Sequence, residues 1–209
     1  MCGRFAFYSP AEATAALFGA ETVHDFKPRF NIAPTQDIAA IRRSDTKGVE
    51  MTSLRWGLVP FWAKDPSIGN RMINARAETV AEKPSFRTAF RVRRCLIPAS
   101  GYYEWRSEGT GKQAYHFTLG PGRVFAMAGL WESQLSPDGS ERETCTILTT
   151  ESEGAVRQIH HRMPVILPAE HYPAWLDNSA PRATNLLGLL TAYHAGDLTI
   201  RPIPSPTGI

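Results

Sequence analysis

Residues 94–105, RCLIPASGYYEW, begin the stretch of sequence that decides the fold. Three segments of similar character follow it: AYHFTL at 114–119, RVFAMAGLWES at 123–133 and ETCTILTT at 143–150. They are rich in β-branched, aromatic and other apolar residues, and turn-forming residues separate them at Gly109–Gly111, Gly120–Gly122 and Asp138–Gly139. Strands at this spacing, joined by tight turns, predict antiparallel pairing.

The same pattern extends toward the N-terminus. IAAIRR at 38–43 and MTSLRWGLV at 51–59 are further candidate strands. Between them and residue 94 lies PFWAKDPSIGNRMINAR at 60–76, which is rich in Pro, Gly and Asn. We expect a long ordered loop there, and long loops in compact domains often carry function.

Helices are expected around the strands. Ser9 and Glu12 form an S-x-x-E capping box, Pro10 suits the first helical position, and Gly19 is a suitable stop. Other short helices are expected at 84–92, after Thr150, at 169–176 and at 183–194. The chain therefore predicts one α+β domain over residues 1–209, in which a mainly antiparallel sheet or partial barrel is flanked by helices.

Length and composition are those of an ordinary globular protein. The chain has 209 residues, of which 43% are hydrophobic and 21% charged. No apolar run approaches the roughly 20 residues that span a bilayer, and the N-terminus has no apolar segment typical of a secretion signal. We expect a cytoplasmic protein, associated with the nucleoid when bound to DNA, and no membrane partner.

Cysteine usage excludes a disulfide framework. The three cysteines, Cys2, Cys95 and Cys145, are odd in number and widely spaced, with no C-x-x-C pair. Cys95 and Cys145 lie in apolar, strand-like segments and are predicted to be core residues. We see no metal-ligand cluster and no phosphate-binding glycine motif, so neither a metal nor a cofactor is expected.

The net charge of +3 is compatible with an ordinary solvated surface. Arginines are nevertheless clustered, and such clusters can contact phosphates. The clustered positions are Arg87, Arg91, Arg93 and Arg94, with Arg71 and Arg76 in a second stretch.

Cys2 is exceptional because of its position. Removal of Met1, which methionine aminopeptidase performs before small residues, leaves a 1,2-aminothiol at the new N-terminus. Its amine has an ordinary pKa of about 7.7–8.0 and its thiol one of about 8.5, so both are partly nucleophilic near neutral pH. The amine can form a Schiff base with an aldehyde, and the thiol can close that imine to a thiazolidine. A chance cysteine after the initiator is the alternative interpretation.

Six motifs in order resemble one family, the SOS-response-associated peptidases (SRAP), also called abasic site processing proteins. The motifs are MCGRF at 1–5, NIAPTQ at 31–36, LRWGLVPFW at 54–62, INARAET at 73–79, GYYEW at 101–105 and IHHRMPVIL at 159–167. The C-terminal RPIPSPTGI at 201–209 lacks the closing segment usual in the family.

The resemblance implies covalent capture of abasic sites in single-stranded DNA by the Cys2 amine and thiol, which shields the lesion during the DNA-damage response. It implies that Glu104 and His160 move protons and that Asn74 holds the amine or the sugar. On a strand, Glu104 faces away from Tyr103 and Trp105. Taken alone, Glu104 would be a surface glutamate, His160 a loop histidine beside His161, and Asn74 a turn residue.

The resemblance also suggests DNA contacts. Arginine forks suit phosphates, and aromatic or proline side chains can stack on or wedge beside bases. The expected DNA-contacting residues are Arg4, Arg76, Arg162, Pro34, Phe61, Trp62, Trp105 and Thr149. A surface ion pair is the alternative role for the arginines and a core position the alternative for Trp62, whereas Trp56 and Trp131 are predicted core residues.

Two other function classes stay open. The Cys2 thiol, with His160 or Glu104 as proton acceptor, could attack a carbonyl as a cysteine-type autopeptidase. A Schiff base at the sugar also makes β-elimination accessible, so lyase activity is a possible accompaniment. A non-covalent reader of modified DNA bases is the third hypothesis, and it would bind without Cys2. We expect a monomer.

Overall fold

The computed structural model describes residues 2–22, 24–44, 46–135, 139–179, 186–191, 193 and 197–206. The strands are β1 Phe5–Phe7, β2 Glu21–Thr22, β3 Arg29–Ile32, β4 Asp37–Ser44, β5 Gly48–Trp56, β6 Asn74–Arg76, β7 Arg94–Ala99, β8 Gly101–Glu108, β9 Gly111–Thr118, β10 Phe125–Leu135, β11 Glu141–Glu151, β12 Arg162–Pro164, β13 Ile166–Leu167 and β14 Thr199–Ile203. The helices are α1 Ala11–Leu17, η1 Pro66–Arg71, η2 Ala77–Thr79, α2 Arg87–Val92, α3 Gly154–Arg157, η3 Ala169–His171 and α4 Tyr172–Leu176.

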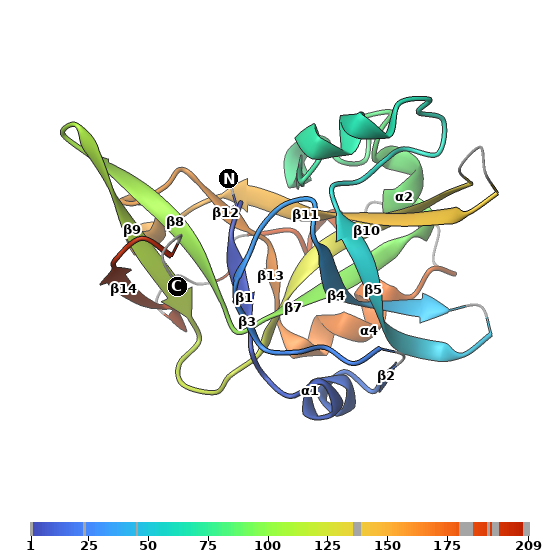
Figure 1. Cartoon of the computed structure of the whole chain (residues 1–209), viewed down its shortest axis with the longest axis horizontal. Coiled ribbons are helices and arrows are strands. Elements are labelled where there is room, and N and C mark those ends of the chain that lie inside the picture. The colour runs from blue at the N-terminus through green and yellow to red at the C-terminus, as the bar shows by residue number, and fades with distance from the viewer. Residues whose placement is uncertain are drawn as a thin grey trace.

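The larger sheet has the order β12-β11-β10-β7-β4-β5-β2. Most of its neighbours are antiparallel, as the closely spaced strands predict, and β10–β11 pairs over seven positions from Gly129↔Ile147 to Leu135↔Glu141. A parallel contact between β11 and β5, Cys145↔Trp56, joins the second and the sixth strands of this order. The strands β11, β10, β7, β4 and β5 therefore form a partial barrel (Figure 1).

The strands of the larger sheet supply much of the main core. Residues with no measurable exposure contribute to it from both faces of the sheet, including Ile41, Leu96, Met127, Ile147 and Trp56. Cys95 and Cys145 are fully buried as well, which confirms their predicted core positions. The indole N–H of Trp56 donates to the carbonyl of Ile73 at 2.8 Å, so this large side chain is buried without an unpaired polar atom.

The smaller sheet has the order β14-β9-β8-β1-β3. The chain passes from the barrel into it at Ser100, the one residue between β7 and β8. Ser100 donates its backbone N–H to the carbonyl of Ala6 at 2.8 Å, and its hydroxyl accepts from the N–H of Tyr8 at 3.2 Å. Both edges of β1 are thus occupied, by β8 and by β3, and the first residues of the chain are held inside the fold.

The first helix forms where expected, but its predicted cap is wrong. The N-cap is Pro10, no side chain caps the helix, and helical residues begin at Ala11. The hydroxyl of Ser9 instead lies 3.3 Å from that of Ser100. Gly19, with φ +61°, follows the C-cap and confirms the predicted stop, since glycine adopts this left-handed conformation without strain.

The other segments are partly as expected. Residues 60–76 contain η1 and β6, so the predicted loop has regular structure of its own. Residues 183–185, 192 and 194 of the helix predicted at 183–194 lie outside the described residues, as does Asp138 of one predicted turn. In the described part of the chain, no helix has the length and apolar character needed to cross a membrane.

Together these observations confirm the α+β class with mainly antiparallel sheets and a few short helices.

Candidate functional site

Cys2 lies where β1 enters the fold beside β8. Phe5 is opposite Tyr102 in this antiparallel pair, and the N–H of Tyr103 donates to the carbonyl of Arg4 at 3.0 Å. Continuing the same register places Gly3 opposite Glu104, one residue from Cys2. The Cys2 side chain has no exposed area. Strand pairing therefore brings the backbone at residues 2 and 3 alongside Glu104, and the charge of this carboxyl acts on the Cys2 thiol.

Glu104 faces inward because side chains alternate along β8. It is 3% exposed and shares its face with Tyr102, while the neighbouring Tyr103 and Trp105 lie on the other face, as predicted. Burial raises the pKa of Glu104 from 4.5 to about 7, although the positive charge of the N-terminal amine acts in the opposite direction. The carboxyl is thus able to take up and release a proton near neutral pH.

The Cys2 thiol and the Tyr102 phenol belong to the same buried group. Burial raises the pKa of Cys2, and the negative charge of Glu104 raises it further. Burial also raises the pKa of Tyr102, with added contributions from Cys2 and Glu104. Tyr102 was missed at the sequence level. Its position two residues before Glu104 on a strand is the signal that could have found it.

His160 approaches the carboxyl from the segment between α3 and β12. Its Nδ1 atom lies 4.0 Å from Oε1 of Glu104, and its side chain is 20% exposed. The same Nδ1 lies 3.0 Å from both the N–H and the carbonyl of Arg162, so that backbone can donate to the neutral ring or accept from the protonated one. Burial lowers the pKa of His160 below 6.5, which makes the imidazole mostly neutral at pH 7.

Asn74 is held on the barrel wall by β6, which runs parallel to β11 with Asn74 opposite Ile147. Its Nδ2 donates to the carbonyl of Ile73 at 3.0 Å. Within the described part of the chain its buried Oδ1 accepts no hydrogen bond, so this acceptor is available to a donor such as an amine or a sugar hydroxyl.

Arg162 lies in an ion pair inside the fold. It is 7% exposed, and its guanidinium donates to both carboxylate oxygens of Glu78, at 2.7 and 2.9 Å. It also donates to the carbonyl of Thr149 at 2.5 Å, and Thr149 itself is 1% exposed. The structure thus places these two expected DNA contacts beneath the surface. Glu78 was missed, although it lies in the INARAET motif.

The other expected DNA contacts lie nearer the surface. Phe61 is 53% and Trp62 50% exposed, high values for such large apolar side chains. Arg76 is also exposed, and the partly exposed residues of the set are Arg4, Pro34 and Trp105. Of the two predicted core tryptophans, Trp56 is fully buried, whereas Trp131 is only partly buried, its ring lying under the guanidinium of Arg42 at 4.3 Å.

The prediction that the clustered arginines at 87–94 can contact phosphates is wrong for two of them. Arg94 is fully buried and donates to main-chain carbonyls, including those of Trp175 at 2.7 Å and Phe90 at 2.8 Å. Arg93 pairs with the buried Glu132 at 2.6 Å. Both side chains cap and join elements of the fold, so neither is available to a phosphate.

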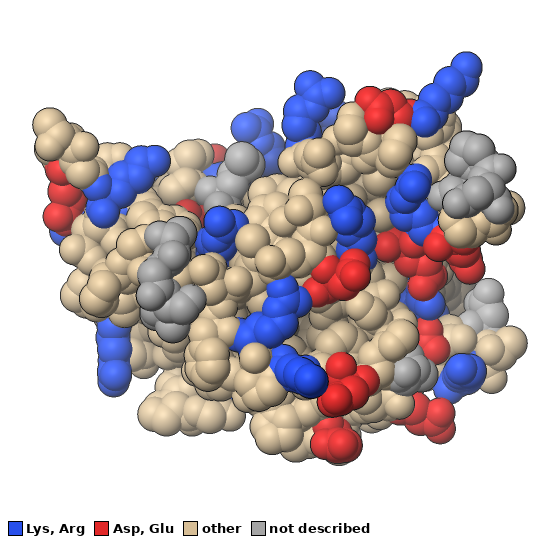
Figure 2. Space-filling view, viewed as in Figure 1, with Lys and Arg blue, Asp and Glu red and all other residues tan. Residues whose placement is uncertain are grey.

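The N-terminal end of β1 lies on the upper edge of the molecule in Figure 1, between the β8–β9 hairpin and the teal segment 60–76. Figure 2 shows Lys and Arg side chains along this upper edge, whereas acidic side chains gather toward the lower right. Nowhere in the described ranges do three His, Cys, Asp or Glu side chains gather closely enough to hold a metal ion.

Comparison with known proteins agrees with these motifs. The chain is 41% identical over 209 residues to a protein of Bacillus subtilis named abasic site processing protein YoaM, covering 98% of this chain and 92% of that one. It is 29% identical to abasic site processing protein YedK of Escherichia coli, covering 84% of this chain and 79% of the relative.

Among solved structures, a protein from Bacteroides thetaiotaomicron superposes with a TM-score of 0.90 at 30% identity, covering 98% of this chain and 96% of the other. The model of the family described as SOS response associated peptidase (SRAP) matches residues 1–207, which includes the C-terminal segment that the six motifs leave out. The chain therefore belongs to the SRAP family.

Proposed function

We propose that this protein processes abasic sites by forming a covalent crosslink to single-stranded DNA through Cys2, once Met1 has been removed. The observation that carries the proposal is the burial of Cys2 within the electrostatic influence of Glu104, whose carboxyl lies 4.0 Å from the imidazole of His160. Relatives that match nearly the whole chain are named abasic site processing proteins, which supports the same substrate here.

The chemistry requires an aldehyde, which an abasic deoxyribose exposes when its ring opens. The Cys2 amine adds to the carbonyl carbon to form a carbinolamine, and loss of one water gives a protonated Schiff base. The Cys2 sulfur then forms a bond to the imine carbon, the C=N double bond becomes single, and the thiol proton is released as the nitrogen becomes a ring amine. The net change is one thiazolidine formed and one water lost.

Glu104 suits the proton transfers in this sequence. With a pKa of about 7 it is present in both protonation states near neutral pH, so it can protonate the departing hydroxyl and later accept the thiol proton. A neutral His160 can assist ring opening at the sugar oxygen. The amide oxygen of Asn74, which accepts no hydrogen bond from the described residues, can accept one from the amine without adding charge.

Single-stranded DNA is the partner that the surface suits. Exposed Phe61 and Trp62 can stack on bases without regard to sequence, and Arg76 can contact phosphates. The crosslink would shield the lesion from cleavage. On this proposal the protein acts as a monomer in the cytoplasm, at the nucleoid when bound to DNA.

The two alternative activities have less support. A cysteine peptidase attacks as the thiolate, and burial next to Glu104 raises the pKa of Cys2 and disfavours that form. In thiazolidine formation the thiol meets a cationic imine, a far stronger electrophile than a peptide carbonyl. Strand cleavage by β-elimination from the Schiff base remains a side reaction of the proposed chemistry.

The deciding experiment is intact mass spectrometry of the protein mixed with a single-stranded oligonucleotide that carries one abasic site. We expect a species equal in mass to protein without Met1 plus DNA minus one water. Cys2→Ala keeps the N-terminal amine but lacks the thiol, so it should give an adduct only when borohydride reduces the Schiff base. The oligonucleotide with an intact base should give no adduct with either protein.

Absence of the adduct from protein that has lost Met1 would contradict the proposal. Covalent modification by a peptide substrate instead of the abasic oligonucleotide would favour the peptidase. Reversible binding of modified duplex DNA that survives Cys2→Ala would favour a non-covalent reader.

A further inference from the structure

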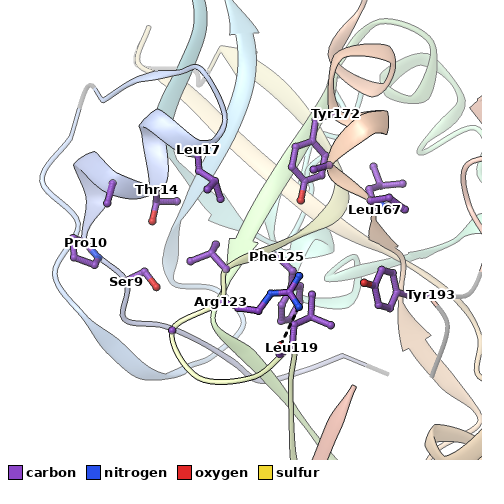
Figure 3. Close-up of a pocket in the computed structure, with 15 residues that line it drawn as sticks. Ser9, Pro10, Thr14, Leu17, Leu119, Arg123, Phe125, Leu167, Tyr172 and Tyr193 are labelled. Carbon is purple, nitrogen blue, oxygen red and sulfur yellow. Dashed lines mark hydrogen bonds between the residues drawn. The ribbon is translucent and has the colours of Figure 1, made fainter. Parts of the chain in front are cut away.

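A second site lies at the opposite end of β1 from Cys2. A cavity of about 600 Å³ is enclosed by α1, by the turn between β9 and β10, and by the segment that leads from β13 into α4 (Figure 3). Pockets of this size hold small organic molecules. None of the residues that line the cavity belongs to the proposed abasic-site chemistry.

The walls of the cavity are mostly apolar. Leu119, Phe125 and Leu167 form its inner side, and Leu17 stands at its edge with 63% of its surface exposed. An exposed leucine beside an open apolar cavity leaves hydrophobic surface in contact with water. A ligand with an apolar body would cover that surface and gain roughly 25 cal/mol for each Å² removed from water.

The polar groups of the cavity are few and come from three separate elements. Figure 3 shows the guanidinium of Arg123 in the middle of the cavity, with the hydroxyl ends of Tyr172 and Tyr193 on the side that faces it. Arg123 is the one charged residue among the described residues that line the cavity, and its contact with the carbonyl of Leu119 is long, at 3.5 Å. Arg123 is an exposed residue, and its positive charge favours an anionic ligand.

Tyr172 is prepared to donate a hydrogen bond. Burial raises its pKa to about 12, so the phenol keeps its proton at neutral pH. The backbone N–H of Ala126 interacts with the phenol oxygen, which leaves the hydroxyl proton for another acceptor. A carboxylate oxygen is such an acceptor.

Thr14 also lines the cavity, from α1, and is 2% exposed.

From this convergence of Arg123, Tyr172 and Tyr193 on an apolar cavity, we propose that the protein has a second binding site for a small organic acid with an apolar body and one carboxylate. The carboxylate binds Arg123 and the tyrosine hydroxyls, while the apolar body lies against Leu17, Leu119 and Phe125. The site is separate from Cys2 and does not depend on the proposed DNA chemistry.

Three probes separate the parts of this proposal. Octanoate carries both an apolar body and a carboxylate, octan-1-ol carries the body alone, and acetate carries the charge alone. In a two-dimensional ¹H–¹⁵N NMR titration, we expect octanoate to shift the amides of Thr14, Leu17 and Arg123 and to leave that of Glu104 in place. Octanol and acetate should bind at least about tenfold more weakly than octanoate, because octanol lacks the carboxylate and acetate lacks the apolar body.

Substitutions test whether Arg123 is the cation that binds the carboxylate. Arg123→Gln should weaken octanoate binding about tenfold and leave octanol binding unchanged, because only the charge-assisted hydrogen bonds are lost. Arg55→Gln removes an exposed arginine that does not line the cavity and should leave both affinities unchanged.

Equal binding of octanoate by Arg123→Gln and the parent protein, or octanoate shifts confined to residues outside the cavity, would overturn the proposal. Arg123→Gln should still form the abasic-site adduct at the parental rate. Failure of this second site is therefore distinguishable from failure of the proposed DNA chemistry.

Discussion

The Nδ1 atom of His160 lies 4.0 Å from Oε1 of Glu104. At neutral pH this contact is not a fixed ion pair, because burial lowers the pKa of the imidazole and raises that of the carboxyl to about 7. The imidazole is thereby mostly neutral and the carboxyl is present in both protonation states, beside the buried Cys2 thiol. Such a pair is suited to moving protons during a reaction and adds little to the stability of the fold.

Replacing Glu104 with glutamine should slow crosslinking by about 10²-fold or more, the usual contribution of a positioned general acid–base. The amide has nearly the same shape and cannot exchange the proton. The measurement is the initial rate of adduct formation with excess abasic oligonucleotide. An unchanged rate would remove Glu104 from the chemistry, and a parental circular dichroism spectrum would confirm that the variant is folded.

The raised pKa of Glu104 also predicts how stability depends on pH. Between 4.5 and about 7 the folded protein keeps a proton that the unfolded chain has lost. The contribution to the free energy of unfolding is therefore fully present below pH 4.5 and is lost as pH rises to about 7, by ~3 kcal/mol.

Urea denaturation at a series of pH values checks this dependence. Glu104→Gln should lack it and should gain stability relative to the parent protein as pH rises through the same interval. Parallel pH profiles for the two proteins would show that the carboxyl is not desolvated in the folded state.

Truncation to alanine should reduce DNA binding at Trp62 and fold stability at Trp56. Trp62 is 50% exposed, so Trp62→Ala should weaken binding of single-stranded DNA by about 1–3 kcal/mol and change stability by less than about 0.5 kcal/mol. Trp56 is fully buried against Phe5 and should cost about 3–5 kcal/mol of stability on conversion to alanine. Fluorescence anisotropy and thermal unfolding measure the two effects. Equal DNA affinity for Trp62→Ala would exclude stacking.

Arg76 is expected to contact a phosphate, because it is exposed at the end of β6. Arg76→Gln should reduce the slope of log affinity against log salt concentration by about 0.7, the contribution of one phosphate on a single strand. Arg43→Gln, an exposed position on β4, serves as the matched control with an unchanged slope. Identical slopes for both variants would place Arg76 outside the DNA interface.

Gly101 should not tolerate a methyl group. A Cβ atom at this position would lie 2.2 Å from Nε2 of His116 and 2.9 Å from the carbonyl oxygen of Phe117. Gly101→Ala should therefore destabilise the protein by about 1–3 kcal/mol, whereas Gly111→Ala meets only the carbonyl of Glu108 at 3.8 Å and should be tolerated. Thermal unfolding of the two variants provides the comparison, and similar melting temperatures would show that the β8–β9 pair readily opens at Gly101.

The strands could be predicted because their signals are local. Segments such as RCLIPASGYYEW carry β-branched and aromatic residues between turn residues, and alternation along β8 correctly assigned Glu104 and Tyr103 to opposite faces. The parallel contacts of β11 with β5 and β6 could not be predicted, since they join residues far apart in sequence. Those contacts close the barrel and hold Asn74 on its wall.

Contacts between residues that lie apart in sequence explain the remaining wrong predictions. Ser9 has the local pattern of a helix cap, but its hydroxyl lies beside Ser100. Arg94 is clustered with other arginines in sequence, yet it is surrounded by main-chain carbonyls. Arg162 suits a phosphate as well as a carboxylate, and only the fold shows Glu78 next to it. In each case the residue type defines what it can bind, and tertiary structure selects the partner.

The burial of Cys2 has a consequence for survival under oxidative stress. Peroxides oxidise the thiolate form of cysteine, and susceptible cysteines combine a low pKa with solvent access. While Met1 is attached, Cys2 has neither property, since its side chain has no exposed area and its pKa is raised. Before Met1 is removed, its sulfur should therefore stay reduced at peroxide concentrations that convert exposed, acidic cysteines to sulfenic acids.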